Sequence, residues 1–276
     1  MSYGHIADYT ALNNGVTMPR FGLGTYKAAG EEVERAVEAA LEMGYRSIDS
    51  AALYGNEAEV GRAIRNSGIV RKELFVTTKV WNDDQGYDET LRAFEKSREA
   101  LGLEVIDLYL IHWPGLHKFK DTWRAMERLY QEGSVRAIGV SNFQIHHLES
   151  LMQTSETVPA VNQVELHPRL QQRKLRDYCV LNNIQIEAWA PLMKGMLNED
   201  PVLKAIAGKY GKAVPQVILR WNLQHDIVTI PKSVTPSRIQ QNGEIFDFEL
   251  TAEEMERIDA MDADERIGRN PDEVLF

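Results

Sequence analysis

Four side chains with acid, base or cationic chemistry follow three short apolar segments of the sequence. Asp49 follows Arg46-Ser-Ile and precedes Tyr54 by five positions, Lys79 ends Leu74-Phe-Val-Thr-Thr-Lys79, and His112 ends Leu108-Tyr-Leu-Ile-His112. If these segments are neighbouring strands, an acid, a phenol, an ammonium and an imidazole meet at one place. Such a set can hold a carbonyl compound and protonate its oxygen.

Each of these residues also has an ordinary structural interpretation. An aspartate after a strand often forms a turn or caps a helix, and Asp49 could do so here. Lys79 could extend its ammonium to solvent, and Tyr54 could be a surface aromatic with a solvated hydroxyl. His112 could be a half-buried histidine with satisfied hydrogen bonds. The catalytic interpretation therefore depends on a fold that brings the strand ends together.

An alternation of apolar strands and amphipathic helices supplies such a fold. The predicted strands are residues 21–23, 47–49, 75–79, 106–111, 135–140, 160–163, 185–190 and 227–230. The predicted helices are residues 31–43, 56–66, 88–101, 119–132, 146–154, 173–182, 201–210, 214–224 and 236–241. Unbroken apolar strands that each lead into a helix indicate a parallel sheet. Eight such units in 276 residues predict an α/β protein with a closed (β/α)₈ TIM barrel.

Two further features complete the predicted architecture. Asn13-Asn14-Gly15 lies between two short strand-like pieces and predicts an N-terminal β-hairpin, and a C-terminal tail follows the last helix. We expect residues 1–276 to form a single domain. An open doubly wound sheet would show the same alternation. Its glycine fingerprint is absent, because Gly22-Leu-Gly24-Thr-Tyr-Lys27 has Lys27 where the third glycine belongs.

Composition narrows the classes of partner. The formal net charge is -10, with 41 acidic against 31 basic residues, which disfavours nucleic acid and anionic membranes as partners. The single cysteine, Cys179, allows no intramolecular disulfide. The N-terminus lacks the pattern of a signal peptide, and no segment approaches the ~18 apolar residues of a membrane span. We expect a cytoplasmic monomer with no metal site.

The charges suggest how the four residues could act together. Tyrosine ordinarily titrates near ~10, and a neighbouring ammonium favours the phenolate, so Lys79 is expected to lower the pKa of Tyr54. Asp49 would pair with Lys79, and His112 could hydrogen-bond the carbonyl oxygen beside Tyr54. No serine or cysteine is placed to attack the carbonyl carbon. A hydride from a bound cofactor is the natural nucleophile.

Several motifs give the chain a resemblance to the aldo-keto reductases over nearly its whole length. They are Gly44-Tyr-Arg46-Ser-Ile-Asp49 with Tyr54 and Asn56-Glu57, Thr78-Lys79-Val-Trp81, Asp107-Leu-Tyr-Leu-Ile-His112-Trp113-Pro114, Ile138-Gly-Val-Ser141-Asn142-Phe143, Asn162-Gln163-Val-Glu165-Leu-His167-Pro168 and Ile230-Pro231-Lys232-Ser233. The resemblance implies that Asp49, Tyr54, Lys79 and His112 form the catalytic tetrad of this family. Tyr54 would then be the general acid of carbonyl reduction.

The segment after the last strand carries a basic pair beside a helix start. Lys232 and Arg238 with nearby hydroxyls are typical of an anion site, and barrels often bind phosphate after strands seven and eight. The resemblance implies that Lys232, Ser233 and Arg238 select NADPH through its 2′-phosphate and that Asn242 faces the adenine. Gln241 stands where many relatives carry glutamate.

The resemblance also implies the contacts of the nicotinamide. Ser141, Asn142 and Gln163 would hydrogen-bond its amide, and Trp189 would stack on its ring. The loop Pro191-Leu-Met193-Lys-Gly195 departs from the commoner Pro-Leu-Gly pattern.

The predicted substrate pocket is walled by Tyr26, Trp81 and Trp113, which follow the first, third and fourth strands. Residues 113–119 reach the next helix quickly, which suggests an open mouth, similar to that of microbial 2,5-diketo-D-gluconate and glyoxal or methylglyoxal reductases. Protozoan prostaglandin F synthase-like relatives are also similar. The predicted function is NADPH-dependent reduction of aldehydes, ketones and small dicarbonyls. The resemblance implies that the acidic C-terminal tail folds over the substrate mouth.

Three alternatives stay open at this stage. The chain could reduce a specialised substrate such as a prostaglandin endoperoxide. It could use the fold as a cofactor-binding partner module, as family members in channels and lenses do. It could also be a lyase or aldolase in which Lys79 forms a Schiff base, which requires a neutral amine.

Overall fold

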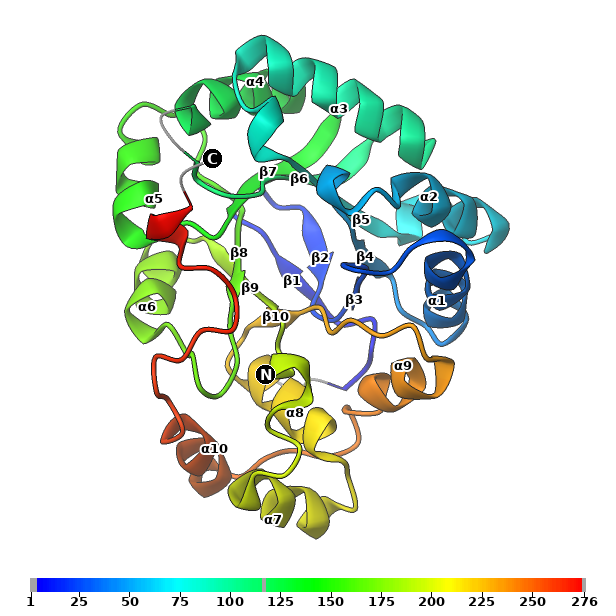
Figure 1. The fold of residues 1–276 in the computed structure, drawn as a ribbon, viewed down its shortest axis with the longest axis vertical. Helices are drawn as coiled ribbons and strands as arrows, with labels where there is room; N and C mark the ends of the chain where they lie inside the picture. Colours follow the sequence, from blue (N-terminus) through cyan, green and yellow to red (C-terminus); the bar gives the residue numbers. More distant parts are fainter. Residues whose placement is uncertain (1–3, 116–117, 275–276) are drawn as a thin grey trace.

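Eight parallel strands form the centre of the molecule. The computed structural model describes residues 4–115 and 118–274, and Figure 1 shows the strands encircled by helices. The strands are β3 (Leu23–Gly24), β4 (Ser47–Asp49), β5 (Phe75–Val80), β6 (Ile106–Ile111), β7 (Val135–Ser141), β8 (Val161–Glu165), β9 (Gln185–Trp189) and β10 (Val228–Thr229). Their order in the sheet follows their order in the chain.

The first and last strands meet and close the barrel. Phe21 bridges to Thr229 and Gly24 bridges to Lys232, both in parallel register. The main-chain N–H of Gly22 donates to the carbonyl oxygen of Thr229 at 3.0 Å. Closure leaves neither strand with a free edge. The predicted (β/α)₈ barrel is confirmed.

The predicted N-terminal hairpin is also confirmed. Strands β1 (Tyr9–Ala11) and β2 (Thr17–Pro19) pair antiparallel. Leu12 and Met18 pack with Phe75 and Val161, the first residues of two barrel strands. Because strands begin at that end, the hairpin covers the end of the barrel opposite Asp49, Lys79 and His112.

Helices surround the barrel. They are α1 (Gly30–Glu42), α2 (Glu57–Asn66), α3 (Tyr87–Leu101), α4 (Phe119–Gln131), α5 (Ile145–Met152), α6 (Arg173–Leu181), α7 (Pro201–Tyr210), α8 (Val214–Gln224), α9 (Pro236–Gly243) and α10 (Ala252–Asp259). The predicted strands and helices are present, with ends that differ by no more than two residues. Helix α10 was not predicted, although Thr251 and Glu254 form a capping box at its start. No helix among the described residues is both long and apolar enough to cross a bilayer.

Two apolar cores hold the layers together. Within the barrel, Leu108 and Leu110 of β6 pack with Ala137 and Val228. Facing outward from the same strand, Tyr109 belongs to the larger core between strands and helices and contacts Phe94 of α3, ring to ring. This alternation explains why every residue of β6 is apolar or paired, as expected for a strand buried on both faces.

Two helical glycines provide a test of helix packing. A Cβ at Gly61 of α2 would lie 2.1 Å from the carbonyl oxygen of Leu101, whereas a Cβ at Gly208 of α7 would meet nothing within 4 Å. We expect Gly61→Ala to destabilise the protein by roughly 1–3 kcal/mol, because the helices must move apart. Gly208→Ala should stabilise it by up to about 1 kcal/mol through helix propensity. Urea unfolding measures both, and equal effects would contradict the packing.

Candidate active site

A buried ion pair lies at the ends of two adjacent strands. The Lys79 ammonium donates to Asp49 Oδ1 at 2.6 Å and Oδ2 at 2.8 Å, and to the carbonyl oxygen of Ser50 at 2.8 Å. Both side chains are essentially fully buried. Asp49 ends β4 and is in register with Thr77 of β5, and Lys79 lies two residues further along β5, so its side chain is on the same face of the sheet as Asp49. The predicted pairing is present.

Tyr54 lies against this pair. Its hydroxyl is 3.4 Å from Lys79 Nζ, and the ammonium is 5.1 Å from the centre of the Tyr54 ring. The tyrosine ends a short 3₁₀ turn, Ala52–Tyr54. Asn56 secures the chain just beyond it, because its amide donates to the carbonyl oxygens of Thr25 and Ala28 and accepts from the Ser50 hydroxyl.

The expected direction of the Tyr54 pKa shift is wrong. Burial, the largest influence, raises the pKa of Tyr54 to about 12, although Lys79 acts in the opposite direction. The phenol is therefore protonated at neutral pH. Lys79 makes the phenolate of Tyr54 less unfavourable, but the protonated phenol remains the form present at neutral pH.

The charge of Lys79 is set by its partners. Burial alone would lower the pKa of Lys79, but the negative charge of Asp49 and the hydrogen bond to it, with the Tyr54 oxygen beside them, outweigh burial, so the pKa lies above its ordinary value. The amine is therefore an ammonium, which cannot attack a carbonyl carbon.

His112 completes the predicted group of four. Its ring lies edge-on to Tyr54, with centroids 5.7 Å apart, and it is almost fully buried. Burial and then the charge of Lys79 hold its pKa well below the ordinary value, so the imidazole is neutral. A neutral imidazole can donate one N–H to an acceptor without bringing a second positive charge.

Aromatic side chains flank the tyrosine and the histidine. The Tyr26 ring contacts Tyr54, with centroids 5.1 Å apart, and the Trp81 ring contacts His112 at 5.2 Å. Tyr26 is half exposed. Trp113 directly follows His112, and its carbonyl oxygen accepts from Gln85 at 2.7 Å. The prediction of a short segment between Trp113 and Phe119 includes residues 116–117, which lie outside the described residues.

The predicted nicotinamide residues form one hydrogen-bonded group, with Ser141 at the end of β7, Asn142 just after it, Gln163 in the middle of β8 and Trp189 at the end of β9. The Ser141 hydroxyl donates to the carbonyl oxygen of Gln163 at 2.8 Å. The Asn142 amide donates to the carbonyl oxygen of His112, and its oxygen accepts from the Trp189 indole N–H at 2.8 Å. Asn142 has a φ of 64°, an unusual backbone for a residue that is not glycine. The structure thus brings these four predicted residues together beside His112.

The predicted phosphate residues lie where the barrel closes. Lys232, which bridges to Gly24, and Arg238 in α9 are exposed, and neither pairs with a carboxylate in the part of the chain described. Ser233 Oγ accepts from the Thr235 N–H at 3.2 Å just before the helix. Asn242 is buried in the last turn of α9. Two cations without counterions beside a helix N-terminus favour anion binding.

The loop after β9 has an unusual backbone. Ala190, Met193 and Lys194 all have positive φ values between 47° and 54°. Left-handed residues other than glycine are sparse, and they gather at functional sites. This tight loop begins immediately after Trp189 and contains the departure from the Pro-Leu-Gly pattern noted in the sequence.

Sequence reasoning missed two buried carboxyl groups. Glu187 of β9 and Glu165 of β8 are both fully buried. Each lies two residues from a predicted nicotinamide residue on the same strand, Trp189 on β9 and Gln163 on β8. Gln163 Nε2 donates to Glu187 Oε2 at 2.7 Å and to Asp49 Oδ2 at 2.8 Å. Inward alternation along each strand was the available signal, because every second residue must face the barrel interior.

Glu165 anchors the C-terminal tail. Its two oxygens accept the main-chain N–H groups of Ile267 and Gly268 at 2.6 Å and 3.0 Å, and His167 contacts it at 3.0 Å. Burial opposes its charge, but these hydrogen bonds prevail and lower the pKa of Glu165. A Cβ at Gly268 would lie 2.4 Å from the Trp189 ring. The tail therefore crosses the ends of β8 and β9, toward α5 (Figure 1).

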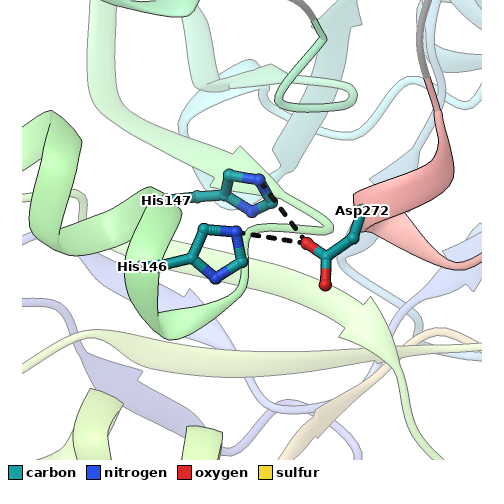
Figure 2. Close-up of side chains that lie close together, drawn as sticks. All are labelled: His146, His147 and Asp272. Carbon is teal, nitrogen blue, oxygen red and sulfur yellow. Dashed lines mark ion pairs between the residues drawn. The ribbon is translucent and has the colours of Figure 1, made fainter.

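A second contact holds the end of the tail. Figure 2 shows His146 and His147 of α5 facing Asp272, with Nε2-to-Oδ1 distances of 3.2 Å and 3.7 Å. His147 Nδ1 accepts from the Gln144 N–H, so the neutral ring carries its proton on Nε2, toward Asp272. Burial lowers the pKa of His147 to about 4, which keeps this form at neutral pH. A metal ion bound to Nε2 would need the proton on Nδ1 instead. This contact is therefore suited to holding the tail rather than a metal ion.

Comparison with known proteins identifies the relatives of the chain. A model of the "Aldo/keto reductase family" matches residues 20–263. Glyoxal reductase of Bacillus subtilis is 60% identical over 272 residues, which cover 98% of this chain and 99% of that protein. The 9,11-endoperoxide prostaglandin H2 reductase of Trypanosoma cruzi is 56% identical, with 95% of this chain and 94% of that protein covered.

Solved structures agree with these relatives. A crystal structure of a Gox0644 mutant in complex with NADPH superposes with a TM-score of 0.94 at 43% sequence identity. The match covers 98% of this chain and 99% of that one. The likeness therefore extends over the barrel, the loops at the strand ends and the tail.

The buried ion pair can be tested by removing one partner and then both. Asp49→Ala should destabilise the protein by roughly 3–5 kcal/mol, because it leaves the Lys79 ammonium buried without a counterion. Adding Lys79→Met removes that charge and should restore much of the loss. Urea unfolding followed by circular dichroism measures both. A double variant as unstable as Asp49→Ala would show that the ion pair is not the source of the effect.

Proposed function

Because the chain belongs to the aldo/keto reductase family, we propose that it reduces small aldehydes, ketones and dicarbonyls to alcohols with NADPH. The observation that supports this most directly is the contact of a protonated Tyr54 with the buried Lys79 ammonium. A proton donor next to a fixed positive charge is suited to a reaction in which a carbonyl oxygen gains negative charge and then a proton.

Tyr54 is the proposed general acid. In the proposed reaction its hydroxyl donates the proton to the substrate oxygen, and the phenolate that results faces Lys79. Lys79 stabilises that phenolate, and Asp49 holds Lys79 in place through two short hydrogen bonds. Tyr54 begins each turnover protonated, because its pKa of about 12 lies far above neutral pH.

His112 is proposed to orient the carbonyl. Its ring lies edge-on to Tyr54, and its neutral imidazole offers an N–H donor. A neutral donor can hydrogen-bond the carbonyl oxygen without competing with Tyr54 for the role of acid. Tyr26 and Trp81 touch the two catalytic rings and would form the apolar wall of the substrate pocket.

The chain offers suitable groups for NADPH, which supplies a hydride to the carbonyl carbon when bound. Trp189 presents an aromatic ring at the end of β9 and is hydrogen-bonded to Asn142, and the side chains of Ser141, Asn142 and Gln163 would hold the nicotinamide amide. Lys232 and Arg238 are exposed cations beside Ser233 and would bind the 2′-phosphate, with Asn242 toward the adenine.

The partial exposure of Tyr54 and the name of a similar protein support the proposed substrate class. Tyr54 is partly exposed, and the half-exposed ring of Tyr26 contacts it. The Bacillus subtilis relative is named for glyoxal, a two-carbon dicarbonyl. A prostaglandin endoperoxide is the second candidate, because the Trypanosoma cruzi relative is named for that substrate. The charged Lys79 disfavours the Schiff-base alternative.

The first test of this function compares the protein with Tyr54→Phe. NADPH absorbance should fall when methylglyoxal or another small aldehyde is added to the unaltered protein. Tyr54→Phe should slow that turnover by about 10²–10⁴-fold, because the general acid is lost. NADPH binding, followed by fluorescence titration, should stay within about twofold. No turnover of any carbonyl by the unaltered protein would refute the function, and lost binding in Tyr54→Phe would assign Tyr54 a structural role.

A second test concerns the 2′-phosphate. Lys232→Ala with Arg238→Ala should weaken NADPH binding by roughly 10–100-fold, since charge-assisted contacts to phosphate are lost. NADH, which lacks that phosphate, should bind nearly as before. The matched control removes two exposed cations of α3, Arg92→Ala with Lys96→Ala, and should change neither affinity. Equal weakening of NADPH and NADH would contradict the assignment.

A further inference from the structure

Glu187 is a buried carboxyl group that the proposed chemistry does not use. It lies on β9 directly beside Gln163 of β8, its register partner, and it has no solvent exposure. Its Oε2 accepts from Gln163 Nε2 at 2.7 Å, and the same nitrogen donates to Asp49 Oδ2 at 2.8 Å. One amide nitrogen thus connects Glu187 with the carboxylate that holds Lys79.

These two hydrogen bonds decide which way the Gln163 amide points. An amide group has two hydrogens on its nitrogen and only lone pairs on its oxygen. With both hydrogens committed to Asp49 and Glu187, the nitrogen faces the interior of the barrel. The Gln163 oxygen is then the end of the amide left to accept a hydrogen bond from another group.

The charges around Glu187 are compatible with this arrangement. Asp49 of β4 and Lys79 of β5 are the charged groups that act on it, and both are buried. Burial first, and then the negative charge of Asp49, raise the pKa of Glu187 above its ordinary value. A protonated Glu187 still accepts through one oxygen, and it leaves Asp49 as the single counterion of Lys79.

We propose that Glu187 is a positioning residue for cofactor binding, which fixes the Gln163 amide with its oxygen toward the amide N–H of the nicotinamide. This inference rests on the proposed function, because it assumes that Gln163 contacts the nicotinamide. Glu187 itself touches neither cofactor nor substrate in this assignment. Glu187 acts on the cofactor through Gln163. Removal of the Glu187 acceptor oxygen should therefore change NADPH affinity only while the Gln163 side chain is present.

The test uses two neutral replacements of similar size. Glu187→Gln keeps an oxygen that accepts from Gln163 Nε2, whereas Glu187→Leu removes it. NADPH affinity is measured by fluorescence titration and turnover by NADPH absorbance with methylglyoxal. We expect Glu187→Leu to weaken NADPH binding about tenfold, as for the loss of one oriented hydrogen bond, and Glu187→Gln to stay within about twofold of the unaltered protein. Turnover at saturating NADPH should change little in either variant.

Two further variants distinguish a positioning role of Glu187 from a general loss of structure. In a Gln163→Ala background, Glu187→Leu should weaken NADPH no further, because the group that it orients is gone. Gln185→Leu is the matched control on β9, since its side chain contacts Thr10 of the hairpin at the other end of the barrel, and it should leave affinity unchanged.

The outcomes distinguish this inference from the proposed function. Absence of NADPH binding in the unaltered protein would refute the function itself. If the unaltered protein binds NADPH, three results would overturn the role of Glu187. They are unchanged affinity in Glu187→Leu, equal weakening in Glu187→Gln and Glu187→Leu, and additive effects with Gln163→Ala. If Glu187→Leu does not fold, the Glu187→Gln affinity decides, and a tenfold loss there would refute the acceptor role.

Discussion

The buried ammonium of Lys79 at the carboxyl ends of the barrel strands constrains the side chains around it. A buried charge is tolerated only when a counterion and further hydrogen bonds replace water. Asp49 and the carbonyl oxygen of Ser50 supply three short contacts, and the Tyr54 hydroxyl lies slightly farther away at 3.4 Å. The same requirement extends one step outward, because Gln163 satisfies the second oxygen of Asp49. The proposed acid is therefore the loosest member of a tightly paired group, and its proton can leave without breaking the ion pair.

Burial and charge act on Tyr54 in opposite directions, and burial dominates. The ammonium of Lys79 alone predicts a lowered pKa for Tyr54. Burial disfavours the phenolate more strongly than Lys79 favours it, which places the pKa near 12. An acid held protonated at rest and stabilised after it has given up its proton is useful for reduction, since the favourable contact with Lys79 strengthens as the reaction proceeds.

The fold and the part of the site formed by Asp49, Lys79 and His112 could be predicted, because both depend on where the strands end. Asp49, Lys79 and His112 end apolar segments, so counting strands placed them together before any coordinates. Glu187 and Glu165 could not be assigned in this way, because their partners lie on other strands or in the tail, up to 103 residues away. Only the register of the barrel and the path of the tail bring such groups together. Helix α10 differs, because its start carries a signal in the local sequence, the capping box of Thr251 and Glu254.

The C-terminal tail connects the predicted cover of the substrate mouth with the predicted nicotinamide residue Trp189. Glu165 accepts two main-chain N–H groups of the tail, which places Gly268 directly against the ring of Trp189. Trp189 is in turn fixed by the hydrogen bond from its indole to Asn142. Any side chain at position 268 would displace either the tail or the ring, so the approach of the tail depends on glycine there. One buried carboxylate thus positions the proposed cover of the substrate mouth and, through Gly268, one face of the aromatic wall proposed for the nicotinamide.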